Sequence, residues 1–266
     1  MTDPQPQSAP VAFWAPRRLR LIRADPPRVP PEHQRAADRI WGEMARANPT
    51  GLFDGPAVAC TSLDWDDPHH VVLSWAPVTY RHYALRRVPG ASALSSLFVA
   101  VLQPADDGRL LVGRMSSWTA APGRWQLPGG SAEPPADHER LDEAALRRHA
   151  ARELAEETGV DTAPHELRLW AVTRGRRGST GVYFRAPARP ASVLAERFMA
   201  AVAAETALGR EPEFAETALG REPEFAETAL VRSPADLGTL PGSHADYLEI
   251  VLRRYAHRPD DSPERA

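Results

Sequence analysis

The chain contains no lysine, so all 32 of its Lys and Arg residues are arginine. Phosphate-binding loops of the Walker type and Schiff-base enzymes both depend on a lysine amine, and the sequence excludes both mechanisms. Cysteine is almost as scarce. Cys60 is the single cysteine, which excludes an intramolecular disulfide and a multi-cysteine zinc site.

Long hydrophobic runs are also missing. The longest apolar run lies around residues 97–102, whereas a membrane-spanning helix needs about 20 apolar residues. The N-terminus lacks the basic start and apolar stretch of a signal peptide. The formal charge of −3 implies no general affinity for nucleic acid or an anionic membrane. We therefore expect a cytoplasmic protein with neither kind of partner.

Residues 141–158 form the clearest predicted helix. They contain no Gly or Pro and are rich in Ala, Leu, Arg and Glu, which favour helix. Leu146, Ala150 and Leu154 recur every four residues and form an apolar stripe. Gly159 stands where a helix C-terminal cap needs a left-handed conformation, so the helix is expected to end there.

The polar side of this helix carries three carboxylates at the spacing i, i+3, i+4: Glu153, Glu156 and Glu157. Like charges at i, i+4 repel, and the helix dipole disfavours anions in the last turn. A hard divalent cation such as Mg²⁺ would reverse both effects, because it takes oxygen ligands. Arg152 can reach Glu156 one turn on and orient it. A solvated acidic face is the other interpretation that this helix allows.

A glycine-rich loop precedes the helix. Pro128-Gly129-Gly130 can approach a ligand closely, because two of its residues lack a Cβ atom. Such a turn feeding a carboxylate-bearing helix is suited to hold a metal ion and a phosphate.

Together these residues resemble the signature of the Nudix hydrolases. Arg152 to Val160 match its second half, Arg-Glu-hydrophobic-x-Glu-Glu-x-Gly-hydrophobic, and Gly129, Gly130 and Glu133 match its opening. The resemblance implies an α/β fold, a Nudix-type α/β/α sandwich with a mixed sheet, over residues 93–257. We expect a smaller N-terminal α+β region at 11–92, with disordered tails at 1–10 and 258–266.

The resemblance also implies a function, which is hydrolysis of the diphosphate in a small nucleotide. The cofactor would be Mg²⁺, with Mn²⁺ as an alternative, and a homodimer is one option for the assembly. The implied catalytic residues are Arg152, Glu153, Glu156 and Glu157. The implied metal site consists of Glu153, Glu156, Glu157 and Gly130, with Gly129 and Gly130 shaping the substrate loop.

One feature departs from the family pattern. Gly130 precedes Arg152 by 22 positions, where the signature has 14, so eight residues are extra. The isolated Glu of the signature has no partner in register, and Glu139 and Glu143 are the nearest substitutes. We expect the insertion, which contains Pro134 and Pro135, to form a loop. A non-catalytic nucleotide sensor on the same fold is the alternative that this departure motivates.

A second resemblance concerns the substrate. Residues 48–55 and 79–81 are similar to an animal Nudix branch that hydrolyses UDP-glucose and UDP-galactose, although Asn-Pro and Asp-Gly are also ordinary turn dipeptides. It implies a nucleoside diphosphate sugar as substrate and a nucleoside monophosphate and a sugar 1-phosphate as products. ADP-ribose and a nucleoside triphosphate are the alternative substrates.

Three residues outside the signature are candidates for substrate binding. Arg174 and Arg176 lie in a predicted hairpin loop, where guanidinium groups could clamp a diphosphate or simply face solvent. Trp125 could stack on a nucleobase or belong to the core.

The chain repeats itself at residues 204–225, where an eleven-residue unit occurs twice, and a third copy runs from Ala226 to Leu230. Each unit contains Gly and Pro, so a continuous helix is not expected, and we predict a long loop before a strand at 226–231. The sequence does not identify the general base. It is either a glutamate of the signature helix or one from this repeated region, which offers Glu205, Glu211, Glu213 and Glu216.

The other predicted elements follow from periodicity and turn residues. We expect helices at 32–48, 192–207 and 245–255, and strands at 11–24, 57–63, 71–75, 97–103, 109–115, 165–174 and 180–185. An acidic turn at 64–67 should separate two of the strands, and 109–115 should pair with 97–103.

Overall fold

The computed structural model describes residues 10–26, 28–47, 52–92, 94–136, 139–176, 178–208 and 223–257. The strands are β1 (Ala12–Trp14), β2 (Arg18–Arg23), β3 (Pro56–Asp67), β4 (His70–Thr79), β5 (Ser95–Leu102), β6 (Leu110–Met115), β7 (Trp125–Gln126), β8 (Arg168–Arg174), β9 (Thr180–Arg185) and β10 (Phe225–Val231). The helices are α1 (Pro31–Ala47), α2 (Glu143–Thr158), α3 (Ala191–Leu208), α4 (Pro234–Leu237) and α5 (Leu248–Ala256), with 3₁₀ turns η1 (Tyr80–Arg87) and η2 (Pro164–Glu166).

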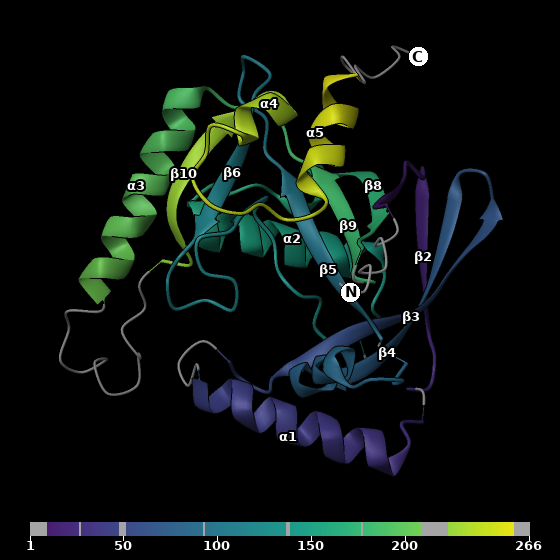
Figure 1. Ribbon diagram of the computed structural model, residues 1–266. Helices are drawn as coiled ribbons and strands as arrows, with labels where there is room; N and C mark the ends of the chain where they lie inside the picture. Colours follow the sequence, from purple (N-terminus) through teal and green to yellow (C-terminus); the bar gives the residue numbers. More distant parts are fainter. Residues whose placement is uncertain are drawn as a thin grey trace, which may run out of the picture.

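Two sheets organise the chain (Figure 1). The larger one has the order β1-β8-β9-β5-β3-β4-β2, and the smaller one has the order β10-β6-β7. The larger sheet is mixed, because β5 runs parallel to β9 whereas β8 and β9 are antiparallel.

Strand β5 is buried on both of its faces. Leu97, Val99 and Val101 pack into one hydrophobic cluster with residues of α2, whereas Ala100 and Leu102 pack into another with residues of α5. This alternation follows from the period of two in a strand. Helices therefore cover both faces, and the α/β/α arrangement with a mixed sheet is confirmed.

The predicted signature helix is confirmed as α2, with Asp142 as its N-cap and Gly159 as its left-handed C-cap. Asp142 accepts a hydrogen bond from the Ala145 N–H at 2.8 Å. Leu146, Ala150 and Leu154 are fully buried, which confirms the apolar stripe. This stripe packs α2 against β5 of the larger sheet.

The loop before the extra residues lies along β5. The Val99 N–H donates to the Gly130 carbonyl at 2.9 Å, and the Val101 N–H donates to the Pro128 carbonyl at 2.8 Å. At Gly129 the φ angle is 149°, and a Cβ atom would lie 2.1 Å from the Val99 carbonyl oxygen. Only glycine fits a strand and loop that approach so closely.

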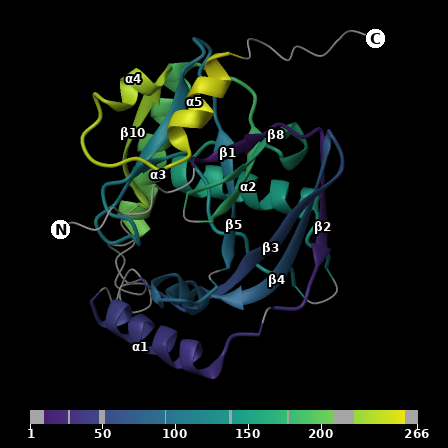
Figure 2. The ribbon, with the colours of Figure 1, turned by 45° about the vertical axis from the view of Figure 1, so that its right-hand side comes forward.

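The N-terminal region joins the same sheet (Figure 2). Strand β3 pairs with β5, β1 pairs with β8, and helix α1 packs on η1 below the β3–β4 hairpin. The sheet therefore crosses the boundary near residue 92, and the division into an N-terminal region and a Nudix region stays a prediction.

Three local predictions were wrong. The strand expected at 11–24 is two strands, β1 and β2, which pair with different partners. Residues 64–67 belong to β3, whose hairpin turn is at Pro68 and His69, because the long β3–β4 pairing continues through the acidic stretch. The turn at 106–108 does close a short antiparallel bridge between Pro104 and Leu110, but beyond it strand β6 pairs with β10 and β7 and not with β5, so the chain passes from one sheet to the other.

Strand β10 confirms the strand predicted after the repeat. Its first residue, Phe225, is fully buried beside Gly113 of β6, and a Cβ atom at Gly113 would lie 2.1 Å from the Phe225 ring. The tails at 1–9 and 258–266 and most of the repeat (209–222) lie outside the described residues. No helix within the described ranges is both long enough and apolar enough to cross a bilayer.

We expect Gly113→Ala to lower the free energy of unfolding by about 1–3 kcal/mol, because the fixed Phe225 ring cannot yield to an added methyl group. Denaturant titration measures this change. Gly42→Ala in α1 is the control, since its Cβ atom would meet only the Arg46 side chain at 3.5 Å. That variant should gain about 0.5–1 kcal/mol from helix propensity. Equal stability of Gly113→Ala and the parent would contradict the packing described.

Candidate active site

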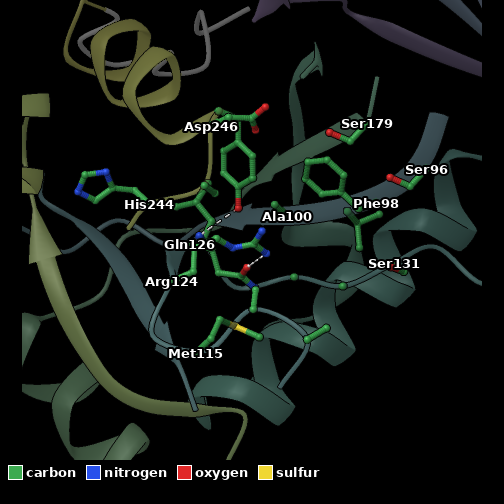
Figure 3. Close-up of a pocket in the computed structure, with 18 of the residues that line it drawn as sticks. Ser96, Phe98, Ala100, Met115, Arg124, Gln126, Ser131, Ser179, His244 and Asp246 are labelled. Atoms are coloured by element: carbon green, nitrogen blue, oxygen red, sulfur yellow. Dashed lines mark hydrogen bonds between the residues drawn. The ribbon is translucent and has the colours of Figure 1, made fainter. Parts of the chain in front are cut away.

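A cavity of about 750 Å³ opens where η1, β5, the Gly129–Gly130 loop and the segment before α5 meet (Figure 3). This volume is within the usual range for a small-molecule site. Its polar and charged lining residues are Tyr80, Arg86, Ser96, Arg124, Gln126, Ser131, Arg176, Ser179, Glu224, Ser243, His244, Asp246 and Tyr247.

Glu157 is the most constrained carboxylate of the site. It is 5% exposed, and its Oε2 accepts a hydrogen bond of 2.6 Å from the Gly129 N–H. Its Oε1 is buried and has no hydrogen-bond partner in the described structure. Burial, followed by repulsion from Glu224, raises the pKa of Glu157 well above its ordinary value.

Glu153 lies one turn earlier, beside the same loop. Its Oε1 is 2.8 Å from His149 Nε2, and its side chain is 14% exposed. A Cβ atom at Gly130 would lie 2.4 Å from Glu153 Oε2, so the second glycine gives the carboxylate room. The predicted approach of the loop to the helix carboxylates is present at both glycines.

Glu156 differs from the other two carboxylates, because its side chain is 63% exposed. Arg152 Nε lies 3.8 Å from Glu156 Oε1, and Arg152 Nη2 lies 3.6 Å from Glu153 Oε1 and 3.8 Å from Glu133 Oε1. The arginine thus lies between acidic groups of the helix and the loop, and its orienting role stays a prediction.

The donor set fits a hard divalent cation. Glu157 presents a buried carboxylate oxygen without a partner, and Glu153 faces the glycine loop. Carboxylate and carbonyl oxygens are the ligands that Mg²⁺ and Mn²⁺ accept. In the described residues, no three His, Cys, Asp or Glu side chains are already gathered at metal-binding distance. The carboxylates are therefore grouped around the loop without converging on one point.

Glu224 approaches these carboxylates from the far end of the chain. Desolvation of the Glu224 carboxylate and repulsion from Glu153 and Glu156 raise the pKa of Glu224 to about 7. By its surface area the residue as a whole is still exposed to solvent. Its neighbour Phe225 anchors it, since that ring is fully buried against β6. The Ser116 N–H also donates to the Glu224 carbonyl at 2.8 Å.

Another part of the cavity combines two aromatic rings with a polar pair. The Phe98 and Tyr247 rings stack with centroids 5.5 Å apart. Arg124 Nη2 donates to Gln126 Oε1 at 2.8 Å, and both side chains line the cavity (Figure 3). Rings of this kind suit a planar base, and the guanidinium suits phosphate oxygens.

The structure separates the three substrate-binding candidates. Arg176 lines the cavity, and its N–H donates to Asp246 Oδ2 at 3.0 Å. Arg174 is exposed at the end of β8 and is not part of the lining. Trp125 is 2% exposed, and its indole N–H donates to the Pro241 carbonyl at 2.9 Å. It belongs to the core, so it leaves no face for a nucleobase.

Several residues of the site were missed by the sequence analysis: Arg86, Arg124, Gln126, His149 and Glu224. Two signals could have found some of them. Glu224 is the second-copy counterpart of Glu213, and it lies two residues before the predicted strand at 226–231. Successive side chains of a strand point to opposite faces. If Trp125 is buried in the core, its neighbours Arg124 and Gln126 therefore lie on the other face, toward the cavity. The predicted bases Glu211, Glu213 and Glu216 lie outside the described residues, and Glu205 lies on α3.

Several solved structures are similar to this chain at low identity and low TM-score. A MutT protein from Methanosarcina mazei Go1 is 19% identical over 61% of this chain and 94% of its own, with a TM-score of 0.38. A Nudix hydrolase from M. smegmatis, RenU, is 19% identical over 62% and 88%, with a TM-score of 0.34. A bifunctional NMN adenylyltransferase/ADP ribose pyrophosphatase from Francisella tularensis, complexed with AMP and a Mn ion, is 15% identical over 64% and 44%, with a TM-score of 0.35. No curated protein matches the chain.

The family model gives the identification. The NUDIX domain matches residues 96–241, which is more than half of the chain and spans β5, the glycine loop, α2 and β10. This range contains every residue of the predicted signature. The chain therefore belongs to the Nudix family and is a Nudix hydrolase, a class of enzymes that act on small nucleotides and generally use divalent metals.

Proposed function

We propose that this Nudix hydrolase uses Mg²⁺ to cleave the diphosphate of a nucleoside diphosphate sugar, releasing a nucleoside monophosphate and a sugar 1-phosphate. The observation that carries the proposal is Glu157. This buried carboxylate accepts a hydrogen bond from the N–H of Gly129, which lines the cavity, and keeps one buried oxygen without a partner in the described structure. Such a group is costly to bury unless a cation completes its surroundings.

The residues that would hold the ion are Glu153, Glu156, Glu157 and the Gly130 carbonyl, with Arg152 orienting the carboxylates. A bound Mg²⁺ supplies neutralisation of phosphate charge and a lowered pKa for water, and Mn²⁺ is the alternative ion. Glu156 is the exposed member, so its side chain must turn toward the loop.

Glu224 is our choice for the general base. It lines the cavity beside the glycine loop and faces the acidic end of α2, so its carboxylate can accept a proton from the attacking water. The water adds to one phosphorus of the diphosphate, and the bond from that phosphorus to the bridging oxygen breaks. Arg124 and Arg176 both line the cavity, and their guanidinium groups would bind phosphate oxygens of the substrate.

The sugar nucleotide is favoured by the N-terminal resemblance. Its two pieces are distant in sequence, yet their described residues meet: Arg81 Nε donates to Asp54 Oδ2 at 2.8 Å, and the Tyr80 N–H donates to the Gly55 carbonyl at 2.9 Å. Tyr80 lines the cavity. The resembling residues thus form one unit at the site, while residues 48–51 lie outside the described structure.

The substrate test is a panel of UDP-glucose, UDP-galactose, ADP-ribose and nucleoside triphosphates with the protein and Mg²⁺. Phosphate is measured after coupling to a phosphatase that acts only on the products. We expect the sugar nucleotides to be hydrolysed with the highest kcat/KM. A higher kcat/KM for ADP-ribose or a nucleoside triphosphate would show that the proposed substrate class is wrong. Binding of these nucleotides without hydrolysis of any of them would favour a non-catalytic sensor.

Glu224→Gln should lower kcat by about 10²–10⁴-fold with little change in KM, because the variant keeps the shape but cannot accept a proton. Steady-state kinetics on the best substrate measures both constants. Glu227→Gln is the matched control, since Glu227 lies three residues further along, on β10, is not part of the cavity lining and forms an ion pair with Arg114. Wild-type kcat in Glu224→Gln would exclude this residue as the base.

Glu157→Gln tests the metal site without relying on activity. In EDTA the raised pKa of Glu157 means that the folded parent binds a proton more tightly than the unfolded chain. The parent should therefore lose stability relative to the variant as the pH rises above the ordinary pKa of a glutamate. Thermal unfolding from pH 4 to 8 measures this difference.

Added Mg²⁺ should reverse that order. At tenfold over its dissociation constant, the ion stabilises the parent by about 1.4 kcal/mol, whereas Glu157→Gln should gain much less. Glu227→Gln should respond to Mg²⁺ like the parent. The same Mg²⁺-dependent rise in melting temperature for the parent and Glu157→Gln would argue against Glu157 as a ligand.

A further inference from the structure

One wall of the cavity comes from outside the matched NUDIX range. Tyr80 and Arg86 of η1 line the same space as Gly129 and Gly130. The 3₁₀ turn is fixed beneath the sheet by packing against α1 and by the contacts of Arg81 and Tyr80 with residues 54 and 55. The N-terminal region therefore supplies a rigid part of the active-site surface.

Arg86 is held in place at this wall. Its Nη2 donates to the Leu94 carbonyl and to Ser96 Oγ, both at 3.1 Å. Its guanidinium also lies over the Tyr83 ring, 4.8 Å from the centroid. Tyr83 in turn donates its hydroxyl hydrogen to the Val58 carbonyl at 2.9 Å. The guanidinium is thus oriented from η1 toward the start of β5, and Arg86 lines the cavity.

Hydroxyl groups gather beside Arg86. Strands β5 and β9 are parallel with Leu97 opposite Thr180, which places the preceding residues, Ser96 and Ser179, next to each other. Ser131 forms a bridge with Phe98 on the other side of β5. Figure 3 shows the three serines on one side of the cavity, away from His244 and Met115.

Two groups of lining residues differ in chemistry. One group is the stacked Phe98 and Tyr247 rings with the Arg124–Gln126 pair, and the other is the three serines with the Arg86 guanidinium, which border Phe98 (Figure 3). Several short donors and acceptors around one space match a group that carries several hydroxyls. A base, by contrast, is matched by the aromatic group.

We propose that the part of the cavity lined by Arg86, Ser96, Ser131 and Ser179 binds the glycosyl group of the substrate, with Arg86 as its specificity-determining residue. This inference rests on the proposed function and adds to it the residues that distinguish a sugar from another leaving group. The N-terminal region then acts as a selectivity element, while the metal helix performs the hydrolysis.

The experiment compares two substrates that share one nucleoside diphosphate: UDP-glucose and the UDP methyl ester, which carries a methyl group instead of the hexose. Arg86→Gln should lower kcat/KM for UDP-glucose by about 10- to 100-fold, because hydrogen bonds to a charged donor are lost. The value for the methyl ester should change less than threefold. Arg87→Gln is the matched control, since Arg87 is the exposed neighbour outside the lining.

Ser179→Ala is the second variant, because it removes one hydroxyl without touching the contacts that hold η1. It should lower kcat/KM for UDP-glucose by about 3- to 10-fold and leave the methyl ester unchanged. Equal losses on both substrates in both variants, or no loss on either, would overturn the glycosyl subsite while leaving hydrolysis intact. A parent enzyme that hydrolyses neither substrate would instead overturn the proposed function.

Discussion

The site depends on the hydrogen bond between the Gly129 N–H and Glu157 Oε2, which spans 2.6 Å. It joins the glycine loop to the last turn of α2, although the two segments are separated by the extra residues of the signature. The loop is itself held on β5 by the Val99 and Val101 amides. A carboxylate is therefore buried at the edge of the central sheet, and its electrostatic cost is what a divalent cation would relieve.

Local patterns were sufficient for α2, because its stripe, cap and carboxylate spacing are set within one stretch of chain. They were insufficient for the pairing of β6, since a tight turn with Asp and Gly fits a hairpin and a crossing between two sheets equally well. The long β3–β4 ladder likewise carried the acidic residues 64–67 into a strand, because pairing over many residues outweighs the weak strand propensity of Asp.

The repeated segment shows most directly that local sequence alone does not determine secondary structure. Ala-Glu-Thr-Ala-Leu is helical as residues 204–208 at the end of α3 and extended as residues 226–230 in β10. The five residues are identical, so their own propensities cannot decide between the two forms. Phe225 decides for the second copy by filling the space beside Gly113, which aligns the following residues with β6. The same anchor places Glu224 at the cavity, although Glu213 and Glu224 lie in identical eleven-residue units.

Strand β5 connects the hydrolytic and selective parts of the site through its period of two. The Val99 and Val101 amides fix the glycine loop, and the side chains of Ser96, Phe98 and Ala100 line the cavity from the same strand. Arg86 reaches this strand from the N-terminal region through Ser96. A signature confined to the loop and α2 cannot encode these contacts, because they arise only when β3 docks on β5. Substrate choice can therefore change through η1 while the carboxylates at the end of α2 remain as they are.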